Sequence, residues 1–199
     1  MEEKMEIRKL TPDLCEDWLA YFDGIAFQDH GEWAFCYCLE GYLDRKTQEE
    51  WVDPKMRRSK AAEMIRTGVM QGYLVYSGDQ VIGWCNVNDR ENYRYLTEMF
   101  REIGYQPQEE PGTRVKAVFC FLVAPQHRGQ GIAGRLLNRI CADAAADGYD
   151  CVEAYPFADA GLAYQYHGTE GMYLKNGFTE KADLGFVKVM RKRMEINRG

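Results

Sequence analysis

The feature that most constrains this chain is a glycine-rich segment placed between a long apolar run and a strongly periodic helical run. It reads Arg128-Gly129-Gln130-Gly131-Ile132-Ala133-Gly134. The first N–H groups of a helix have no partner inside the helix, and the aligned peptide dipoles make that end positive. Glycines let an anion approach the backbone, and the guanidinium of Arg128 fits phosphate oxygens. The segment therefore predicts a phosphate-binding site at the start of a helix.

Apolar residues elsewhere recur with periods that predict a mixed order of strands and helices. A glycine-containing connection, Gly78-Asp79, joins two alternating runs and predicts an antiparallel hairpin. Thr11 is the expected cap of the first helix. The run 115–123 is too apolar to be an edge strand. The expected strands are 6–10, 72–77, 80–88, 115–123, 151–155 and one or two within 178–192, and the expected helices are 11–22, 54–67, 132–147 and 170–176.

The composition is that of an ordinary globular domain, with 46% apolar and 28% charged residues over 199 positions. The sequence shows no repeat, linker or low-complexity run, so we expect a single domain over 1–199. No window approaches the roughly 20 apolar residues that span a bilayer, and the N-terminus lacks the basic and apolar parts of a signal peptide. We therefore expect a cytoplasmic protein with no membrane partner.

The charge and the cysteines argue against two classes of ligand. The formal net charge is −6, whereas nucleic-acid binding needs a basic surface. The seven cysteines are scattered, and no second pair or histidine cluster follows Cys36 and Cys38 at the spacing of a zinc site. We therefore expect no nucleic-acid partner, no metal ion, and buried thiols.

The same glycines also fit a dinucleotide-binding fingerprint, Gly129-x-Gly131-x-x-Gly134, with Glu153 near the position of its ribose-binding acid. In that fold the glycines follow the strand directly, whereas residues 124–128 intervene here and a hairpin precedes the unit. An NAD(P)-dependent oxidoreductase is therefore the less favoured interpretation. A phosphate-loop nucleotidase is excluded because no Gly-Lys-Ser/Thr follows the glycines.

Three segments in the right order resemble the GNAT superfamily of N-acetyltransferases. Val123-Ala124-Pro125 followed by Arg128-x-x-Gly131-x-Ala133 is similar to the signature of that family. Met172-Tyr173-Leu174-Lys175-Asn176-Gly177-Phe178 looks like its later segment, and Val81-Ile82-Gly83-Trp84 resembles its middle strands. The resemblance covers about 72–178.

This resemblance implies a mixed α/β fold. Its central twisted sheet of six to seven mostly antiparallel strands would splay between strands 4 and 5, with helices on both faces. It implies acetyl-CoA as cosubstrate, bound by about 113–178, and a variable region for the acceptor in about 24–70 and 88–112. Homodimers are frequent in the family, although nothing in this sequence indicates one.

The resemblance also implies roles for individual residues. The amides of Arg128, Gly129, Gln130, Gly131, Ile132, Ala133 and Gly134 would hold the CoA pyrophosphate, and Leu122 and Val123 would pair with the pantetheine arm. Tyr173 would protonate the departing thiolate, a role that suits a phenol of pKa near ~10. Asn176 is an expected nucleotide contact.

The amine acceptor also needs a base, and the run 115–123 carries no Asp, Glu or His to supply one. Glu153 is the first candidate, followed by Asp29, His30 and Glu32. The missing acid also favours an alternative, a non-catalytic acyl-CoA-binding or regulatory module. Aromatic residues in the variable region predict a pocket for a primary amine, from a small molecule, an antibiotic-like compound or a peptide.

Overall fold

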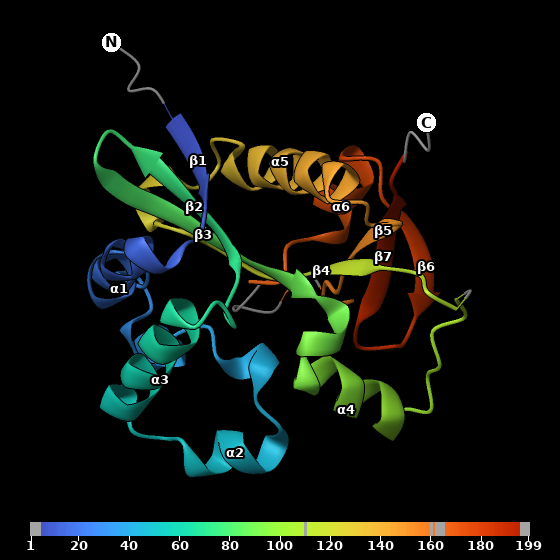
Figure 1. Cartoon of the computed structure of the whole chain (residues 1–199), viewed down its shortest axis with the longest axis horizontal. Coiled ribbons are helices and arrows are strands. Elements are labelled where there is room, and N and C mark those ends of the chain that lie inside the picture. Colours follow the sequence, from blue (N-terminus) through green and yellow to red (C-terminus); the bar gives the residue numbers. More distant parts are fainter. Residues whose placement is uncertain (1–4, 110, 160, 162–165, 196–199) are drawn as a thin grey trace.

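The computed structural model describes residues 5–109, 111–159, 161 and 166–195, and a seven-stranded sheet runs through its middle (Figure 1). The strand order is β1-β2-β3-β4-β5-β7-β6, in which β4 and β5 pair in parallel and the other neighbours are antiparallel. The predicted mixed α/β fold is confirmed. The strands are β1 (Met5–Lys9), β2 (Gly72–Ser77), β3 (Gln80–Asp89), β4 (Val115–Val123), β5 (Cys151–Ala154), β6 (Thr179–Asp183) and β7 (Lys188–Arg193).

The strands β4 and β5 are paired over a short stretch and then part. Their register runs from Val115↔Cys151 to Val118↔Ala154, where β5 ends while β4 continues to Val123. On its other side β4 stays paired with β3, with a bulge at Phe119 that shifts the register by one residue. Among the described residues, the second half of β4 therefore has an edge without a strand partner, as the resemblance implied.

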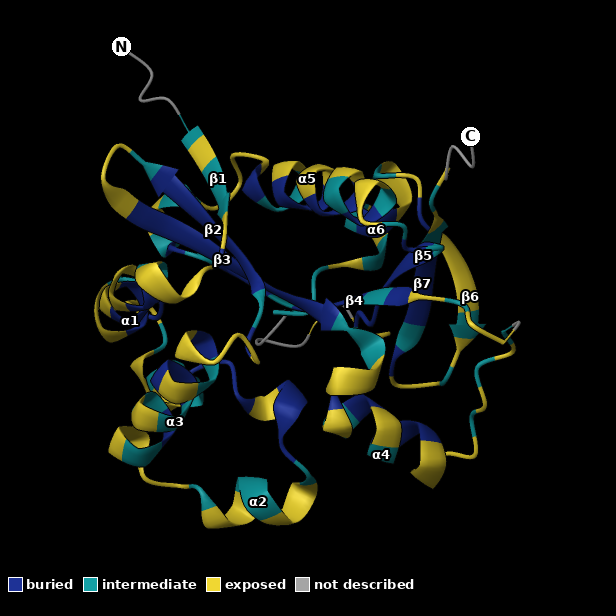
Figure 2. Cartoon of the chain, viewed as in Figure 1, coloured by how far each residue is buried: buried dark blue, intermediate teal, exposed yellow. Residues whose placement is uncertain are grey.

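Helices cover both faces of the sheet (Figures 1 and 2). One face packs against α5 (Ile132–Ala146) and α6 (Glu170–Lys175), whose buried residues join those of the central strands in one core. The opposite face packs against α1 (Cys15–Gly24), α3 (Pro54–Arg66) and α4 (Arg94–Glu102), and α2 (Arg45–Glu50) lies farther from the sheet. The open edge of β4 therefore has a packed layer on each side.

Most helix boundaries follow the local sequence signals. Asp53 accepts a hydrogen bond from the N–H of Lys55 and caps α3, whose first residue is Pro54. The predicted role of Thr11 is wrong: its side chain makes no capping bond, and a 3₁₀ turn over Pro12–Leu14 precedes α1. Between α1 and α3 the chain forms two 3₁₀ helices, Gly31–Cys36 and Glu40–Tyr42, and α2, none of which is among the expected helices.

Among the described residues, no helix is both long and apolar enough to cross a bilayer. The same residues contain no group of three or more His, Cys, Asp or Glu side chains placed to hold a metal ion.

Candidate active site

The glycine-rich segment forms the start of α5, as predicted. A 3₁₀ turn, Pro125–His127, leads from the end of β4 into it. Gly129 and Gly131 both have φ of +75°, a left-handed conformation that L side chains rarely adopt. A Cβ at either position would meet no atom within 4 Å, so the glycines serve the backbone turn and leave its outer side open.

This turn leaves a row of backbone donors unused. In the described part of the chain, the N–H groups from Gly129 to Gly134 have no protein acceptor, and the first bond of the helix runs from Arg135 to the carbonyl of Gly131. Unpaired N–H groups at the positive end of a 15-residue helix favour an anion. The geometry is therefore that of a phosphate site.

Arg128 is held at the same place by two contacts. Its Nε donates to the carbonyl of Val123 at 3.0 Å, and its guanidinium pairs with the carboxylate of Asp29. Burial raises the pKa of Asp29, but the Arg128 guanidinium outweighs this effect and leaves that pKa below its ordinary value. The Asp29 carboxylate is therefore ionised and paired with the Arg128 guanidinium, beside the unpaired amides.

A cleft of about 410 Å³ lies over the glycine-rich turn. Gln130 is absent from its described lining; its side chain donates to the carbonyl of Gln126. Asn176 is absent too, and packs against Gly134 while donating to the carbonyl of Met172 at 2.8 Å. The predicted binding residues that do line the cleft are Val123, Arg128, Gly129, Gly131, Ile132, Ala133 and Gly134.

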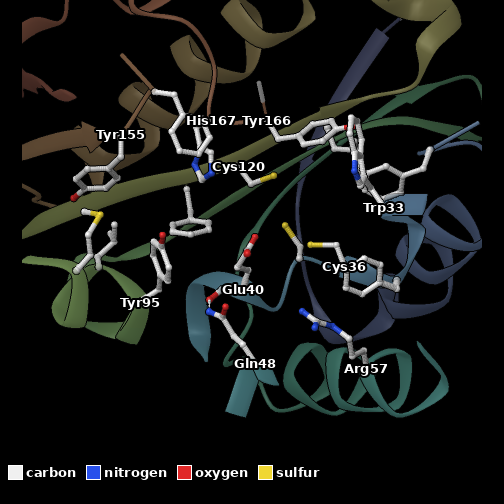
Figure 3. A pocket seen from close by; sticks show the side chains of 18 of the residues that line it. Trp33, Cys36, Glu40, Gln48, Arg57, Tyr95, Cys120, Tyr155, Tyr166 and His167 are labelled. Carbon is white, nitrogen blue, oxygen red and sulfur yellow. Dashed lines mark hydrogen bonds between the residues drawn. The ribbon is translucent and has the colours of Figure 1, made fainter. Parts of the chain in front are cut away.

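A second cavity of about 410 Å³ lies on the opposite face of β4 (Figure 3). Nine of the twenty described residues that line it are aromatic, among them Trp33, Tyr95 and Tyr166. Leu122, expected at the pantetheine arm, points into this cavity rather than into the cleft. Trp33, Phe35 and Tyr95 of the variable region thus line a cavity, whereas Tyr37 and Tyr93 are absent from its described lining.

The cleft and the cavity meet at the segment 166–168. Tyr166 lines both, and its carbonyl accepts a hydrogen bond from the N–H of Phe121 on the open edge of β4. His167 lines the cavity and Gly168 lines the cleft. Burial lowers the pKa of His167 to about 4, although a hydrogen bond with the Phe119 backbone opposes the shift. His167 is therefore neutral at pH 7.

Residues 37–178, more than half of the chain, match the family model described as the acetyltransferase (GNAT) family. The chain belongs to the GNAT acetyltransferase family. No curated protein sequence matches it.

Solved structures of GNAT proteins share the fold over nearly their whole length. The PaiA N-acetyltransferase of Thermoplasma acidophilum, in complex with coenzyme A, is 16% identical with a TM-score of 0.55, covering 96% of this chain and 99% of its own. The acetyltransferase of Thermus thermophilus is 13% identical with a TM-score of 0.57, covering 98% and 100%. YncA of Salmonella typhimurium, solved with acetyl-CoA, is 16% identical with a TM-score of 0.50, covering 98% and 96%.

Within this GNAT fold, Tyr173 is buried between the strands and α5. Its hydroxyl donates to the carbonyl of His167 at 2.7 Å, and burial holds its pKa well above the ordinary value. A Cβ at Gly168 would lie 3.0 Å from that hydroxyl, so the backbone of the 166–168 segment covers it. Tyr173 is therefore a protonated phenol directly behind the segment that separates cleft and cavity.

Glu153 lies in a buried charge cluster instead of in either pocket. Its carboxylate accepts hydrogen bonds from Arg191 at 2.7 Å, from Arg90 at 3.2 Å and from the hydroxyl of Tyr155 at 2.9 Å. Both arginines also pair with Glu109. Glu153 is absent from the described linings of the cleft and the cavity; of the three residues named above that donate to its carboxylate, Tyr155 lines the cavity. Its surroundings favour a structural role, and its role as the base stays a prediction.

The other predicted bases are also engaged. Asp29 pairs with Arg128, and Glu32 is 3.0 Å from the His30 ring. His30 lines the cleft and stacks on Trp33, with ring centroids 3.9 Å apart. Neither of these two acids, nor His30, is among the described residues that line the aromatic cavity.

Sequence reasoning missed two charged residues that do line the aromatic cavity, Glu40 and Arg57. Glu40 follows the cysteine pair in a segment without a clean period, and Arg57 is one of two adjacent arginines on α3. Their positions along the sequence carried no signal, because tertiary packing, including that of α3 against the 3₁₀ turn Gly31–Cys36, brings them to one pocket.

Sequence reasoning also missed the environment of Cys38, which lines the cavity beside Cys36 and Cys120. The Cys38 sulfur accepts hydrogen bonds from Trp84 at 3.2 Å and Asn86 at 3.5 Å. The Cys120 thiol and these donors lower the pKa of Cys38, against the effect of burial. Cys38 itself has φ of 52°, a strained value for a side-chain-bearing residue. The three cysteines are free thiols.

We expect Glu153→Gln to lower the free energy of unfolding by about 3 kcal/mol, because removing one partner leaves buried arginines undercompensated. Chemical denaturation at pH 7 measures the change. Glu63→Gln, which removes an exposed pair with Lys60 on α3, is the control and should change the value by less than about 1 kcal/mol. Equal effects of the two substitutions would contradict the structural role of Glu153.

The same charge cluster predicts that the free energy of unfolding falls at acidic pH. Burial raises the pKa of Glu109, but Arg90 and Arg191 outweigh it, so the folded-state pKa lies below the ordinary value. The unfolded chain then takes up the proton first, and the stabilisation present above about pH 4.3 is lost as the pH falls through the folded-state value. Glu109→Gln should flatten the acid limb of a plot of unfolding free energy against pH. An unchanged acid limb would exclude Glu109 as a contributor.

Proposed function

We propose that this GNAT protein is an N-acetyltransferase that transfers the acetyl group of acetyl-CoA to a primary amine by direct attack. The observation that carries the proposal is the row of unpaired N–H groups from Gly129 to Gly134 beside Arg128, at the start of α5. The cleft above this row adjoins the aromatic cavity at Tyr166, so donor and acceptor can meet there. The complexes of PaiA with coenzyme A and of YncA with acetyl-CoA support the choice of donor.

Each group of predicted binding residues would contact a different part of acetyl-CoA. The amides from Gly129 to Gly134, including that of Gln130, would hold the pyrophosphate, with Arg128 as the cation. Val123 lines the cleft at the open edge of β4 and would pair with the pantetheine arm, while Leu122 forms the wall on the acceptor side. Asn176, packed against Gly134, would meet the nucleotide at the rim.

The reaction joins the amine nitrogen to the thioester carbon and breaks the C–S bond. An ammonium first gives one proton to a base, and the neutral amine attacks. Tyr173 then gives its proton to the departing thiolate, and the second amine proton restores the phenol. For this role the Tyr173 hydroxyl exchanges the His167 carbonyl, its present acceptor, for the thiolate sulfur.

The test of this function measures binding and turnover together. Thermal shift with CoA and with NAD(P) identifies the donor, and a CoA-release assay with a panel of primary amines identifies transfer. We expect stabilisation by CoA and release that depends on the amine. Stabilisation by NAD(P) alone would support the oxidoreductase, and tight CoA binding without turnover for any amine would support the non-catalytic module.

For the acid, we expect Tyr173→Phe to lower kcat by about 100-fold, the ordinary contribution of a general acid, with little change in CoA affinity. Tyr76→Phe is the matched control. Tyr76 lies on β2, is also buried, and its hydroxyl donates to Asp17 at 2.8 Å. Steady-state kinetics and CoA titration measure the two quantities. An unchanged kcat in Tyr173→Phe would remove Tyr173 from the acid role.

For the phosphate site, we expect Asp29→Asn to tighten CoA binding by up to about 5-fold, because the exposed carboxylate no longer competes for Arg128. Arg128→Gln should weaken binding by about 10-fold, through loss of a charge-assisted hydrogen bond. Calorimetric titration measures both. Asp23→Asn removes a comparable pair with Arg58 and is the control. Weaker binding in Asp29→Asn would show that the pair organises the site instead of competing for it.

A further inference from the structure

The aromatic cavity contains two opposite charges on one side (Figure 3). Glu40 comes from the 3₁₀ turn Glu40–Tyr42, and Arg57 from α3. Both side chains extend toward the space below Cys120 and His167, which lie on the β4 side. His167 is neutral at pH 7, and Glu40 and Arg57 are the acidic and the strongly basic side chain among the described lining residues.

Neither charge is neutralised by an ion pair within the described residues. Arg57 is 5% exposed, donates one hydrogen bond from Nη1 to the carbonyl of Trp51, and keeps its Nε buried without a partner. The neighbouring arginine, Arg58, instead pairs with Asp23 at 2.8 Å. A buried guanidinium with unused donors costs free energy unless an acceptor reaches it. Arg57 therefore has capacity for an anionic ligand group.

Glu40 is placed to meet a cation. Burial raises its pKa and the positive charge of Arg57 opposes the shift, while the residue as a whole is exposed to solvent and lines the cavity. Aromatic rings on the surrounding walls, such as Trp33 and Tyr95, add favourable faces for an ammonium and for a flat apolar body. A carboxylate in this position can also accept a proton from an ammonium before it attacks.

We propose that the acceptor is a small aromatic amine that also carries an anionic group, with its ammonium at Glu40, its anion at Arg57 and its ring among the aromatic walls. This inference rests on the proposed N-acetyltransferase function and names the substrate class. The cavity volume of about 410 Å³ suits a ligand of this size. In the transfer, Glu40 takes the first ammonium proton, and the N–C bond forms as the C–S bond breaks. Tyr173 gives its proton to the departing thiolate, and the second amine proton restores the Tyr173 phenol.

Matched pairs of amines that differ only by a carboxylate test the proposal. The pairs are phenylalanine with 2-phenylethylamine, tryptophan with tryptamine, and 4-(aminomethyl)benzoate with benzylamine; spermidine represents a purely cationic acceptor. We expect kcat/KM to favour the carboxylated member of at least one pair by about 10-fold or more, because the decarboxylated amine leaves Arg57 unpaired. A preference for the decarboxylated amines in all pairs, or for spermidine, would overturn it.

Substitutions at Arg57 and Glu40 test whether these residues cause the preference for carboxylated amines. Arg57→Gln should remove the 10-fold preference by lowering kcat/KM for the carboxylated amine more than for the decarboxylated one, whereas Glu40→Gln should lower kcat/KM for both members. Arg58→Gln, which breaks only the Asp23 pair, is the control for Arg57, and Arg57→Lys keeps the charge where Arg57→Gln does not fold. Equal losses for both members in Arg57→Gln would contradict anion recognition.

A direct binding measurement separates failure of this inference from failure of the proposed function. CoA affinity of each variant should equal that of the unaltered protein, since neither residue lines the CoA cleft. Turnover of any amine with no preference within the pairs overturns the substrate class and leaves the acetyltransferase standing. If CoA binds and no amine is acetylated, calorimetry of the same pairs with the CoA complex decides: tighter binding of the carboxylated member supports the class, and equal binding overturns it.

Discussion

The arrangement of this protein depends on where the parallel pairing of β4 and β5 stops. After Val118 and Ala154 the two strands no longer share hydrogen bonds, and β4 runs on for five more residues with one edge open. Unpaired backbone groups at a sheet edge need another partner. Here the edge is met at one point by the carbonyl of Tyr166, and it borders the cleft over α5 and the aromatic cavity on the other face.

The charge cluster around Glu153 sits where the parallel pairing ends. Glu153 and Arg191 are opposite one another on β5 and β7, and Arg90 and Glu109 come from the segment between β3 and β4. A buried pair is weak evidence for net stability but a strong constraint on geometry, since each charge tolerates few other neighbours. The cluster therefore fixes the course of the chain between β3 and β4 against the sheet, and Tyr155 carries that constraint to the cavity wall.

The sequence predicted the parts of the fold that local rules determine. The β2–β3 hairpin, the strand 115–123 and the glycine turn before α5 each follow from periodicity or from a glycine that the backbone requires. Residues 25–53 resisted prediction because tertiary packing orders them: Tyr37 and Cys38 adopt positive φ without being glycine. Likewise, no spacing in the sequence links Glu153 to Arg191, or Glu40 to Arg57, since each pair meets only after the sheet and helices are assembled.

The segment 27–33 belongs to both halves of the site. Asp29 and Gln28 contact Arg128 and Gln126 beside the phosphate turn, whereas Trp33 lines the aromatic cavity. His30 joins the two, since it lines the cleft and stacks on Trp33. An anion that binds Arg128 would compete with Asp29 for the same guanidinium. One short piece of chain therefore contacts both the glycine-rich turn and the wall of the aromatic cavity.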